Sequence, residues 1–327
     1  MTTRGFLLGK FMPPHAGHVA LVEAAAKLVD ELTVLVCWLP DDPIPGERRL
    51  DWMRGMFPSC RVVGHGDVVP QEPSESPDFW PIWAGIVATV HPEPIDYLFA
   101  GEEYGLELAT QVGGFFVPLG GRILEARDAV SSLSASAVRA DPAGHWSYLP
   151  EPVRDHYRKT VCLHGAESTG KSTLAAQLAP ELGTIWVPEY GRSHCEVHRE
   201  ALTRADLLLI GRAQQAMTQA SARWAGPVLL VDTDALVTAA WCEVLLGDRP
   251  AELMEQEKAD LYLLMEPDLP WVDDGTRFFA DPAEHARFAA IVEAVLIDAG
   301  VPFERISGTG EVRLAAARSA IATLRRQ

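Results

Sequence analysis

A glycine-rich segment near the middle of the chain constrains its local fold more than any other stretch. Residues 165–172 (GAESTGKS) match the pattern GxxxxGK[ST], follow the apolar run 161–164 and precede the helical pattern 173–179. The motif works between a strand and a helix, because the N–H groups of the turn and of the helix start then converge on phosphate oxygens. The sequence therefore predicts an α/β domain with a nucleotide-binding P-loop.

The residue types of this loop indicate phosphate chemistry. Lys171 is expected to bridge the β- and γ-phosphates of ATP, and the Ser172 hydroxyl to ligate Mg²⁺. Asp232 ends the apolar run 228–232, and we expect it to hold magnesium or to accept a proton from an attacking hydroxyl. The residues predicted to surround the phosphates are Gly165, Ala166, Glu167, Ser168, Thr169, Gly170, Lys171, Ser172 and Thr173.

Short apolar runs alternate with helical patterns along the chain. The first half predicts strands at 5–8, 32–39, 61–63, 96–100 and 115–118, with helices at 19–29, 47–56, 79–90 and 106–111. Further strands are predicted at 184–187, 228–232, 261–265 and 302–306. Such alternation predicts right-handed βαβ units and open parallel sheets with helices on both faces. The proline-rich stretch 67–81 is predicted to be a loop.

The chain is long enough for two domains. It has 327 residues, about twice the usual size of a single domain. Prolines and charged residues interrupt the alternation around residues 149–159, and we place a boundary near Tyr157. The halves share no residue-level repeat and begin with different glycine signatures. We therefore predict a Rossmann-like domain over 1–157 and a P-loop domain over 158–327.

Two histidines follow the first predicted strand, in the sequence GKFMPPHAGH. The carboxyl edge of a parallel sheet is where ligands bind, and a helix that starts there offers N–H groups to phosphate. We expect His15, His18 and Lys10 to stabilise charge on a phosphate under attack, with Gly9 and Phe11 beside the nucleotide. The alternative is that one histidine only caps the helix.

A second motif, LSASAVR, places Ser134, Ser136 and Arg139 after the last predicted strand of this domain. Together with GKFMPPHAGH it resembles the HxGH nucleotidylyltransferase superfamily, which implies that these side chains bind ATP phosphates. The segments 79–83 and 98–105 resemble the nicotinamide mononucleotide adenylyltransferase branch, in which an aromatic residue stacks on the pyridine ring. Trp80 or Trp83 is expected to do so, and core packing is the alternative.

Three polar segments follow predicted strands of the second half: EYGR at 189–192, DTD at 232–234 and WVDDGTR at 271–277. They belong to the sheet edge that carries the P-loop. We expect the last segment to be a lid whose Arg277 neutralises the transferring phosphoryl group. In this order, all these motifs resemble those of the bifunctional NadR-type proteins, which join a nicotinamide mononucleotide adenylyltransferase to a ribosylnicotinamide kinase.

This resemblance covers nearly the whole chain and implies an enzyme of NAD salvage. The second domain would phosphorylate nicotinamide riboside with Mg·ATP, and the first would adenylylate nicotinamide mononucleotide to NAD and pyrophosphate. Adenylyl transfer needs no general base, because the attacking phosphate is already an anion. Some family members carry an additional N-terminal helix-turn-helix domain, which we do not expect here because the first strand begins by residue 5. The residues implied to bind the riboside are Glu189, Tyr190, Arg192, Asp234, Trp271 and Asp274.

Several alternatives stay open at this level. The chain could be a kinase for another nucleoside with a weak or regulatory adenylyltransferase domain, or a nucleotide sensor without turnover. The residues do not decide which carboxylate is the kinase base. Arg48 and Arg49 either reach phosphate or lie on a solvated helix face. Zinc binding by His194 and His198 is disfavoured, because the HExxH pattern is missing.

The charge balance limits the partners that we expect. With 28 Lys and Arg against 45 Asp and Glu, the formal net charge is −17, which repels nucleic acid and anionic membranes. The 5 cysteines are spaced without a CxxC pair, as in reduced cytoplasmic proteins. The sequence shows neither a signal peptide nor an apolar run of membrane-spanning length. We expect small-molecule partners and leave homo-oligomer formation open.

Overall fold

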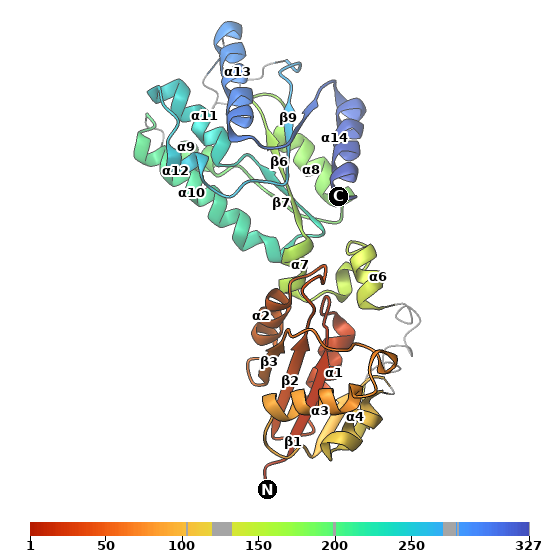
Figure 1. Ribbon diagram of the computed structural model, residues 1–327. Helices are drawn as coiled ribbons and strands as arrows, with labels where there is room; N and C mark the ends of the chain where they lie inside the picture. Colours follow the sequence, from red (N-terminus) through yellow and green to blue (C-terminus); the bar gives the residue numbers. More distant parts are fainter. Residues whose placement is uncertain (103, 120–132, 199–200, 271–278, 280, 327) are drawn as a thin grey trace. The chain divides into compact units, whose positions relative to one another are not determined.

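The computed structural model describes residues 1–102, 104–119, 133–198, 201–270, 279 and 281–326 (Figure 1). The chain divides into two compact units, Met1–His156 and Tyr157–Gln327. Each unit is an α/β fold built on a parallel sheet, which confirms the predicted fold class. Among the described residues, none of the helices combines the length and the apolar character needed to span a bilayer.

The first unit contains a parallel sheet whose described strands have the order β3-β2-β1-β4-β5. The strands are β1 (Arg4–Gly9), β2 (Glu31–Cys37), β3 (Arg61–His65), β4 (Tyr97–Ala100) and β5 (Phe115–Pro118). The helices are α1 (Ala16–Ala26), α2 (Gly46–Met56), α3 (Phe79–Val90), α4 (Tyr104–Val112), α6 (Ala135–Ala140) and α7 (Glu151–Tyr157). The reversal of strand order at β1 brings the β1–α1 loop next to β4, which is where open α/β sheets bind ligands.

Helices cover both faces of this sheet. Leu7 and Val34 pack in one apolar cluster with side chains of α1 and α2, whereas their chain neighbours Phe6 and Leu35 pack with α3 and α4. All four side chains are fully buried. The strands are therefore apolar on both faces, which is why they stand out in the sequence as continuous apolar runs.

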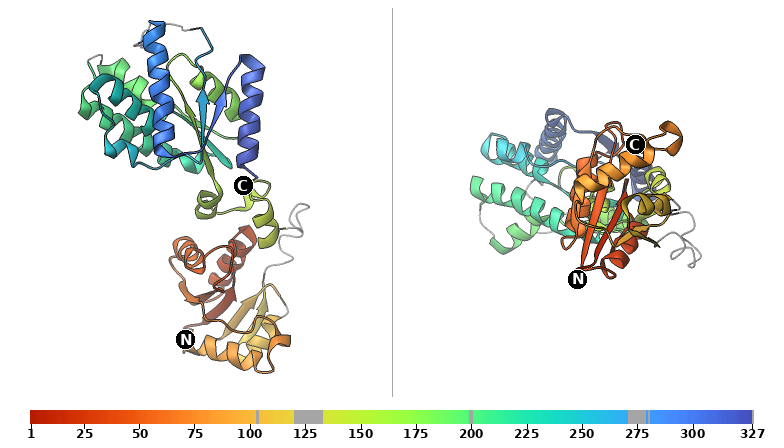
Figure 2. Two further views of the ribbon diagram at one scale, coloured as in Figure 1. Left: turned by 45° about the horizontal axis from the view of Figure 1, so that its top comes forward. Right: turned by 60° about the horizontal axis from the view of Figure 1, so that its bottom comes forward.

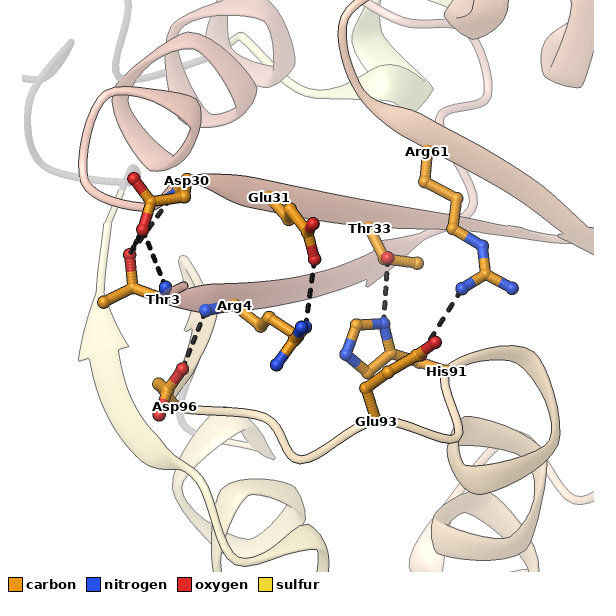
Figure 3. Close-up of polar contacts among 9 residues, drawn as sticks. All are labelled: Thr3, Arg4, Asp30, Glu31, Thr33, Arg61, His91, Glu93 and Asp96. Atoms are coloured by element: carbon orange, nitrogen blue, oxygen red, sulfur yellow. Dashed lines mark hydrogen bonds and ion pairs between the residues drawn. The ribbon is translucent and has the colours of Figure 1, made fainter. Parts of the chain in front are cut away.

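The amino-terminal edge of the same sheet is closed by polar contacts (Figure 3). They connect the starts of β1, β2 and β3 to the segments that precede β2 and β4, with separations of 2.7–3.5 Å. The contacts are Thr3–Asp30, Arg4–Glu31, Arg4–Asp96, Thr33–His91 and Arg61–Glu93. The residues predicted to bind ligands in this unit lie at the opposite, carboxyl edge.

The second unit contains a parallel sheet whose described strands have the order β10-β9-β6-β8-β7. The strands are β6 (Lys159–His164), β7 (Trp186–Val187), β8 (Val228–Asp232), β9 (Leu261–Met265) and β10 (Phe303–Ile306). The helices are α8 (Lys171–Glu181), α9 (Tyr190–His198), α10 (Arg204–Ser221), α11 (Ala235–Leu246), α12 (Ala251–Met254), α13 (Pro282–Ala299) and α14 (Gly310–Leu324). The order places β8, which ends in Asp232, directly beside β6, which leads into the P-loop.

The central strands of this sheet are again buried on both faces. Val161 and Leu163 of β6 pack with α8 and α14, whereas Cys162 packs with α10, α11 and α13 on the other face. Figures 1 and 2 show α8 and α14 on one side of β6 and β9, and α11 and α13 on the other. His164 is two residues after Cys162 and lies on the same face, fully buried.

Candidate functional site

A cavity of about 910 Å³ lies at the carboxyl edge of the first sheet. It is bounded by the β1–α1 loop, α3, the segment after β4 and the start of α6. It is lined by the residues of both sequence motifs and by the two tryptophans that the sequence singled out in this unit: Gly9, Lys10, Phe11, His15, His18, Trp80, Trp83, Ser134, Ser136 and Arg139. Segments more than a hundred residues apart in sequence therefore form a single site.

His15 both caps α1 and lines the cavity. Its Nδ1 accepts a hydrogen bond from the Gly17 N–H at 3.2 Å, so a neutral ring carries its proton on Nε2 and can donate it. The His18 ring lies 3.9 Å from the His15 ring, centroid to centroid. Burial lowers the pKa of His15 to about 4, and burial together with His15 lowers the pKa of His18 to about 3. Both rings are neutral hydrogen-bonding groups near pH 7.

The backbone around these histidines is held by arginines. Arg139 donates from Nη1 to the Met12 carbonyl, which ties α6 to the β1–α1 loop. Arg49 is fully buried and donates to the Lys10 carbonyl and to the Asp42 carboxylate, each at 2.5 Å. Both earlier interpretations of Arg49 are therefore wrong: it neither faces solvent nor lines the cavity. It supports the loop that carries Lys10.

The two tryptophans of α3 differ in their surroundings. Trp83 is buried, donates its indole N–H to the Pro70 carbonyl at 3.0 Å and packs near Phe79. Trp80 is only half-buried and meets the Phe79 ring edge to face, with centroids 4.9 Å apart. Trp80 therefore has ring surface available to a ligand, whereas Trp83 is mainly a core residue that forms the wall behind it.

A second cavity, of about 490 Å³, lies at the carboxyl edge of the second sheet. It is lined by the P-loop, by the segment between β7 and α9, by the end of β8 and by α11. The predicted residues that line it are Gly165, Glu167, Ser168, Thr169, Gly170, Lys171, Ser172, Thr173, Glu189, Arg192 and Asp232. The strand order of the sheet explains this convergence, because β6, β8 and β7 are neighbours.

The P-loop has the backbone that its sequence predicts. Gly165 and Gly170 have φ angles of 147° and 81°, which other residues adopt only with strain. A Cβ atom on Gly165 would also lie 3.0 Å from the Met265 carbonyl oxygen. Lys171 lies across the loop and donates from Nζ to the Gly165 and Ala166 carbonyls at 3.0 and 2.7 Å. When a nucleotide binds, phosphate oxygens can take the place of these carbonyls as acceptors of the hydrogen bonds from the Lys171 ammonium.

Asp232 and Ser172 meet at the mouth of the loop. The Ser172 hydroxyl donates to Asp232 Oδ2 at 2.5 Å, and Oδ1 of this buried carboxylate has no hydrogen-bond partner among the described residues. Burial raises the pKa of Asp232, and Lys171 and the Ser172 hydroxyl oppose this effect. A hydroxyl and a carboxylate with unused oxygen lone pairs beside a phosphate-binding loop form a donor set that suits a divalent cation.

Two buried polar residues that the motifs did not reveal fix the geometry of this site. Gln214 of α10 accepts from the Tyr190 N–H at 2.8 Å and donates to the Pro188 carbonyl at 3.3 Å, so it holds the segment that carries Glu189. Arg313 of α14 donates to the Thr169 carbonyl behind the P-loop and to Asp268. The partners named here lie more than twenty residues away in sequence, so local motifs carry no signal for these contacts.

Several predicted substrate residues lie elsewhere. Asp234 is not among the residues that line the cavity, because its carboxylate caps α11 through the Leu236 N–H at 2.9 Å and accepts from the Tyr262 hydroxyl at 2.6 Å. Tyr190 and Ala166 also do not line the cavity. Trp271, Asp274 and Arg277 lie outside the described residues.

The remaining histidine pair lies on α9. The rings of His194 and His198 are 4.4 Å apart, and His194 Nε2 lies 3.6 Å from an Asp206 carboxylate oxygen. Within the described part of the chain, this pair does not belong to a group of three or more metal-ligating side chains that could hold one ion.

Comparison with protein families matches the description "AAA domain" over residues 160–313. This range contains the P-loop, Asp232 and Arg313. The chain is also similar to two curated proteins, each named "Trifunctional NAD biosynthesis/regulator protein NadR". The one from Escherichia coli K12 is 27% identical over 326 residues, covering 93% of this chain and 78% of the relative. The one from Salmonella typhimurium LT2 is 26% identical over 324 residues, covering 92% and 78%.

Two solved structures share the architecture along almost the whole chain. A NadR protein in complex with NR superimposes with a TM-score of 0.77 at 22% identity, covering 99% of this chain and 96% of the other. A NadR protein in complex with NAD and AMP-PNP gives a TM-score of 0.74 with the same identity and coverage. At this identity the structures establish a shared fold of both units.

Proposed function

The chain is homologous to the NadR proteins over nearly its whole length, and on that premise we propose that it is a two-site enzyme of NAD salvage. The second unit phosphorylates nicotinamide riboside with ATP, and the first unit adenylylates the resulting nicotinamide mononucleotide to NAD. The observation that carries this proposal is that each unit has its own cavity lined by a full set of phosphate-binding groups.

In the kinase site, the 5′-hydroxyl of the riboside attacks the γ-phosphorus of ATP, and ADP leaves. Lys171 and the loop N–H groups stabilise the phosphoryl oxygens as charge develops. Ser172 and Asp232 would hold Mg²⁺, which neutralises charge on the β- and γ-phosphates when it is bound. This role for Asp232 leaves Glu189, which lines the cavity from the β7–α9 segment, to bind the ribose hydroxyls and to accept the proton.

In the adenylyltransferase site, a phosphate oxygen of the mononucleotide attacks the α-phosphorus of ATP, and pyrophosphate leaves. The nucleophile is an anion, so the site needs positioning and charge stabilisation and no base. His15 can donate from Nε2, and Lys10 and Arg139 contribute positive charge. The first turn of α1 contains no acidic residue, so the helix N-terminus also favours phosphate. Trp80 offers a ring face to the nicotinamide.

We also propose that the enzyme works in the cytoplasm. All five cysteines are free thiols in the structure, as expected of a protein in a reducing compartment.

A chromatographic time course tests the proposed function. Purified protein with ATP and Mg²⁺ should convert nicotinamide riboside to mononucleotide and then to NAD, and a parallel reaction started from the mononucleotide should also yield NAD. A reaction from riboside that stops at the mononucleotide would mean that the first unit is weak or regulatory. If neither compound is consumed, the assignment is wrong, and a nucleoside panel would then test for a kinase of different specificity.

A further inference from the structure

A group of metal-ligating side chains lies on the second sheet, outside the residues that line the two cavities; Cys162 and His164 are buried, and Asp234 is half-buried. Cys162 and His164 project from the same face of β6, and Asp234 stands at the N-cap of α11. One donor atom from each residue lies within 4.8 Å of the other two. Among the residues that the structure describes, this is the one group of three or more such side chains that was found close together.

His164 provides the observation that points to a bound ion. Its Nε2 lies 3.0 Å from the Val292 carbonyl oxygen, and a carbonyl only accepts, so the ring proton is on Nε2. Nδ1 therefore presents a lone pair, and it is a buried atom without a hydrogen-bond partner in the described structure. A ring that donates one N–H to a backbone carbonyl and leaves the other nitrogen free is oriented as metal-binding histidines are.

Asp234 is held in a similar way. Oδ1 accepts from the Leu236 N–H at 2.9 Å and Oδ2 from the Tyr262 hydroxyl at 2.6 Å. The Val237 N–H also interacts with this carboxylate, so three donors fix its orientation. A carboxylate has about four lone-pair sites, which leaves one for a metal ion. Apolar side chains of α11, α13 and β9 surround the carboxylate, and the Lys258 ammonium is near enough to interact with it. Lys258 compensates part of the negative charge of the site, and a bound divalent ion would compensate the charge of a thiolate as well.

We propose that Cys162, His164 and Asp234 bind a zinc ion that joins β6 to the start of α11. Zinc is the common protein metal whose usual ligands include thiolate, imidazole and carboxylate together. A thiolate, a neutral imidazole and a carboxylate carry two negative charges, which a divalent ion balances. Ligand bonds of about 2.0–2.3 Å place ligand atoms about 3.5 Å apart, so the separations in the present group, which are within 4.8 Å, shorten by up to about 1.3 Å on binding.

The site has a structural consequence for the kinase cavity. Thr233, with φ of 66°, separates Asp234 from Asp232, and its N–H donates to the Leu163 carbonyl at 3.1 Å. An ion on Asp234 would hold the corner that positions the Asp232 carboxylate. Because Cys162 and His164 are fully buried, the ion enters during folding or local opening and exchanges slowly.

Metal analysis of the untagged full-length protein tests the proposal. When the protein is expressed with added Zn²⁺ and loosely bound ion is removed by dialysis, we expect about one zinc per chain. Expression in medium that supplies Co²⁺ in place of Zn²⁺ should give a thiolate-to-cobalt charge-transfer band in the near ultraviolet. Cys162→Ala and His164→Leu should lose both the retained metal and the band.

Two matched controls separate this site from other thiols. Cys242 is buried in the same apolar cluster, and Cys195 lines the kinase cavity on the helix that carries His194 and His198. Cys242→Ala and Cys195→Ala should retain the metal and the band. The proposal is overturned if the wild-type protein retains no stoichiometric metal, which does not depend on the folding of any variant. It is also overturned if Cys162→Ala keeps the cobalt band or Cys195→Ala loses it.

Discussion

Replacing His15 by Asn should remove both a catalytic donor and a source of acid sensitivity. The pKa of His15 is lowered by burial from 6.5 to about 4, so the folded chain binds fewer protons at this residue than the unfolded chain between these values. The stability that depends on a neutral ring is therefore complete above about pH 6.5 and is lost as the pH falls toward 4. For these two pKa values, lowering the pH from 7 to 5 costs about 2 kcal/mol.

Urea unfolding at both pH values measures this contribution. Asn accepts the helix-capping hydrogen bond nearly as well as other good N-cap residues, so the variant should match the wild type near pH 7. Between pH 7 and pH 5 the wild type should lose about 2 kcal/mol more than His15→Asn. The same variant should lose adenylylation by about a hundredfold or more and retain riboside phosphorylation. Equal pH dependence of the two proteins would refute the assignment of a buried, neutral ring.

Four further substitutions test individual contacts. Asp232→Asn should lower the kcat of riboside phosphorylation by about 10²-fold or more, because it removes a ligand of Mg²⁺. The urea midpoint of unfolding near pH 7 should stay equal or rise, because burial raises the pKa of this carboxyl; a lower urea midpoint would contradict this. Trp80→Ala should weaken binding of nicotinamide mononucleotide, seen as a raised KM, by an amount that corresponds to about 1–3 kcal/mol, with little effect on stability. Trp83→Ala should lower the free energy of unfolding in urea by about 3–5 kcal/mol. Identical effects of the two substitutions would refute the distinction between a ligand-facing and a core tryptophan. Gln214→Leu should raise the KM for the riboside and destabilise the chain by about 1–3 kcal/mol, because it removes the acceptor of the part-buried Tyr190 N–H. Steady-state kinetics and calorimetry measure these two effects, and an unchanged KM or an unchanged stability would contradict the prediction.

The local motifs predicted much of both candidate sites. The P-loop and the segment with His15 and His18 each depend on a strand, a turn and a helix start that are contiguous in sequence. The glycines at positions 165 and 170 indicate positive φ angles, and the structure has positive φ at both. Strands that are buried on both faces appear as apolar runs, which explains why the sheet strands were found with small errors at their ends. One larger difference is β7, predicted over 184–187 and observed only at Trp186–Val187.

The residues that the sequence missed are buried polar side chains with distant partners. Arg49 looked like a charged residue on a helix surface, and only the tertiary structure brings Asp42 and the Lys10 carbonyl to it. Asp234 shares a motif with Asp232, but the two carboxylates have different partners. Asp232 meets the P-loop hydroxyl, and Asp234 caps α11. The two carboxylates point to different partners because Thr233, between them, has a positive φ. The spacing of the two aspartates in the sequence gives no sign of this backbone conformation.

The central claim is that two separate sites act in series, and the most direct test compares two single variants in one assay. Lys171→Met should form NAD from nicotinamide mononucleotide and leave the riboside unconsumed. His18→Ala should convert the riboside to the mononucleotide and stop there. A mixture of the two variants with riboside, ATP and Mg²⁺ should form NAD, because the mononucleotide released by one is used by the other. If either substitution abolishes both reactions in a folded protein, or if Lys171→Met still phosphorylates the riboside, the two-site account is contradicted.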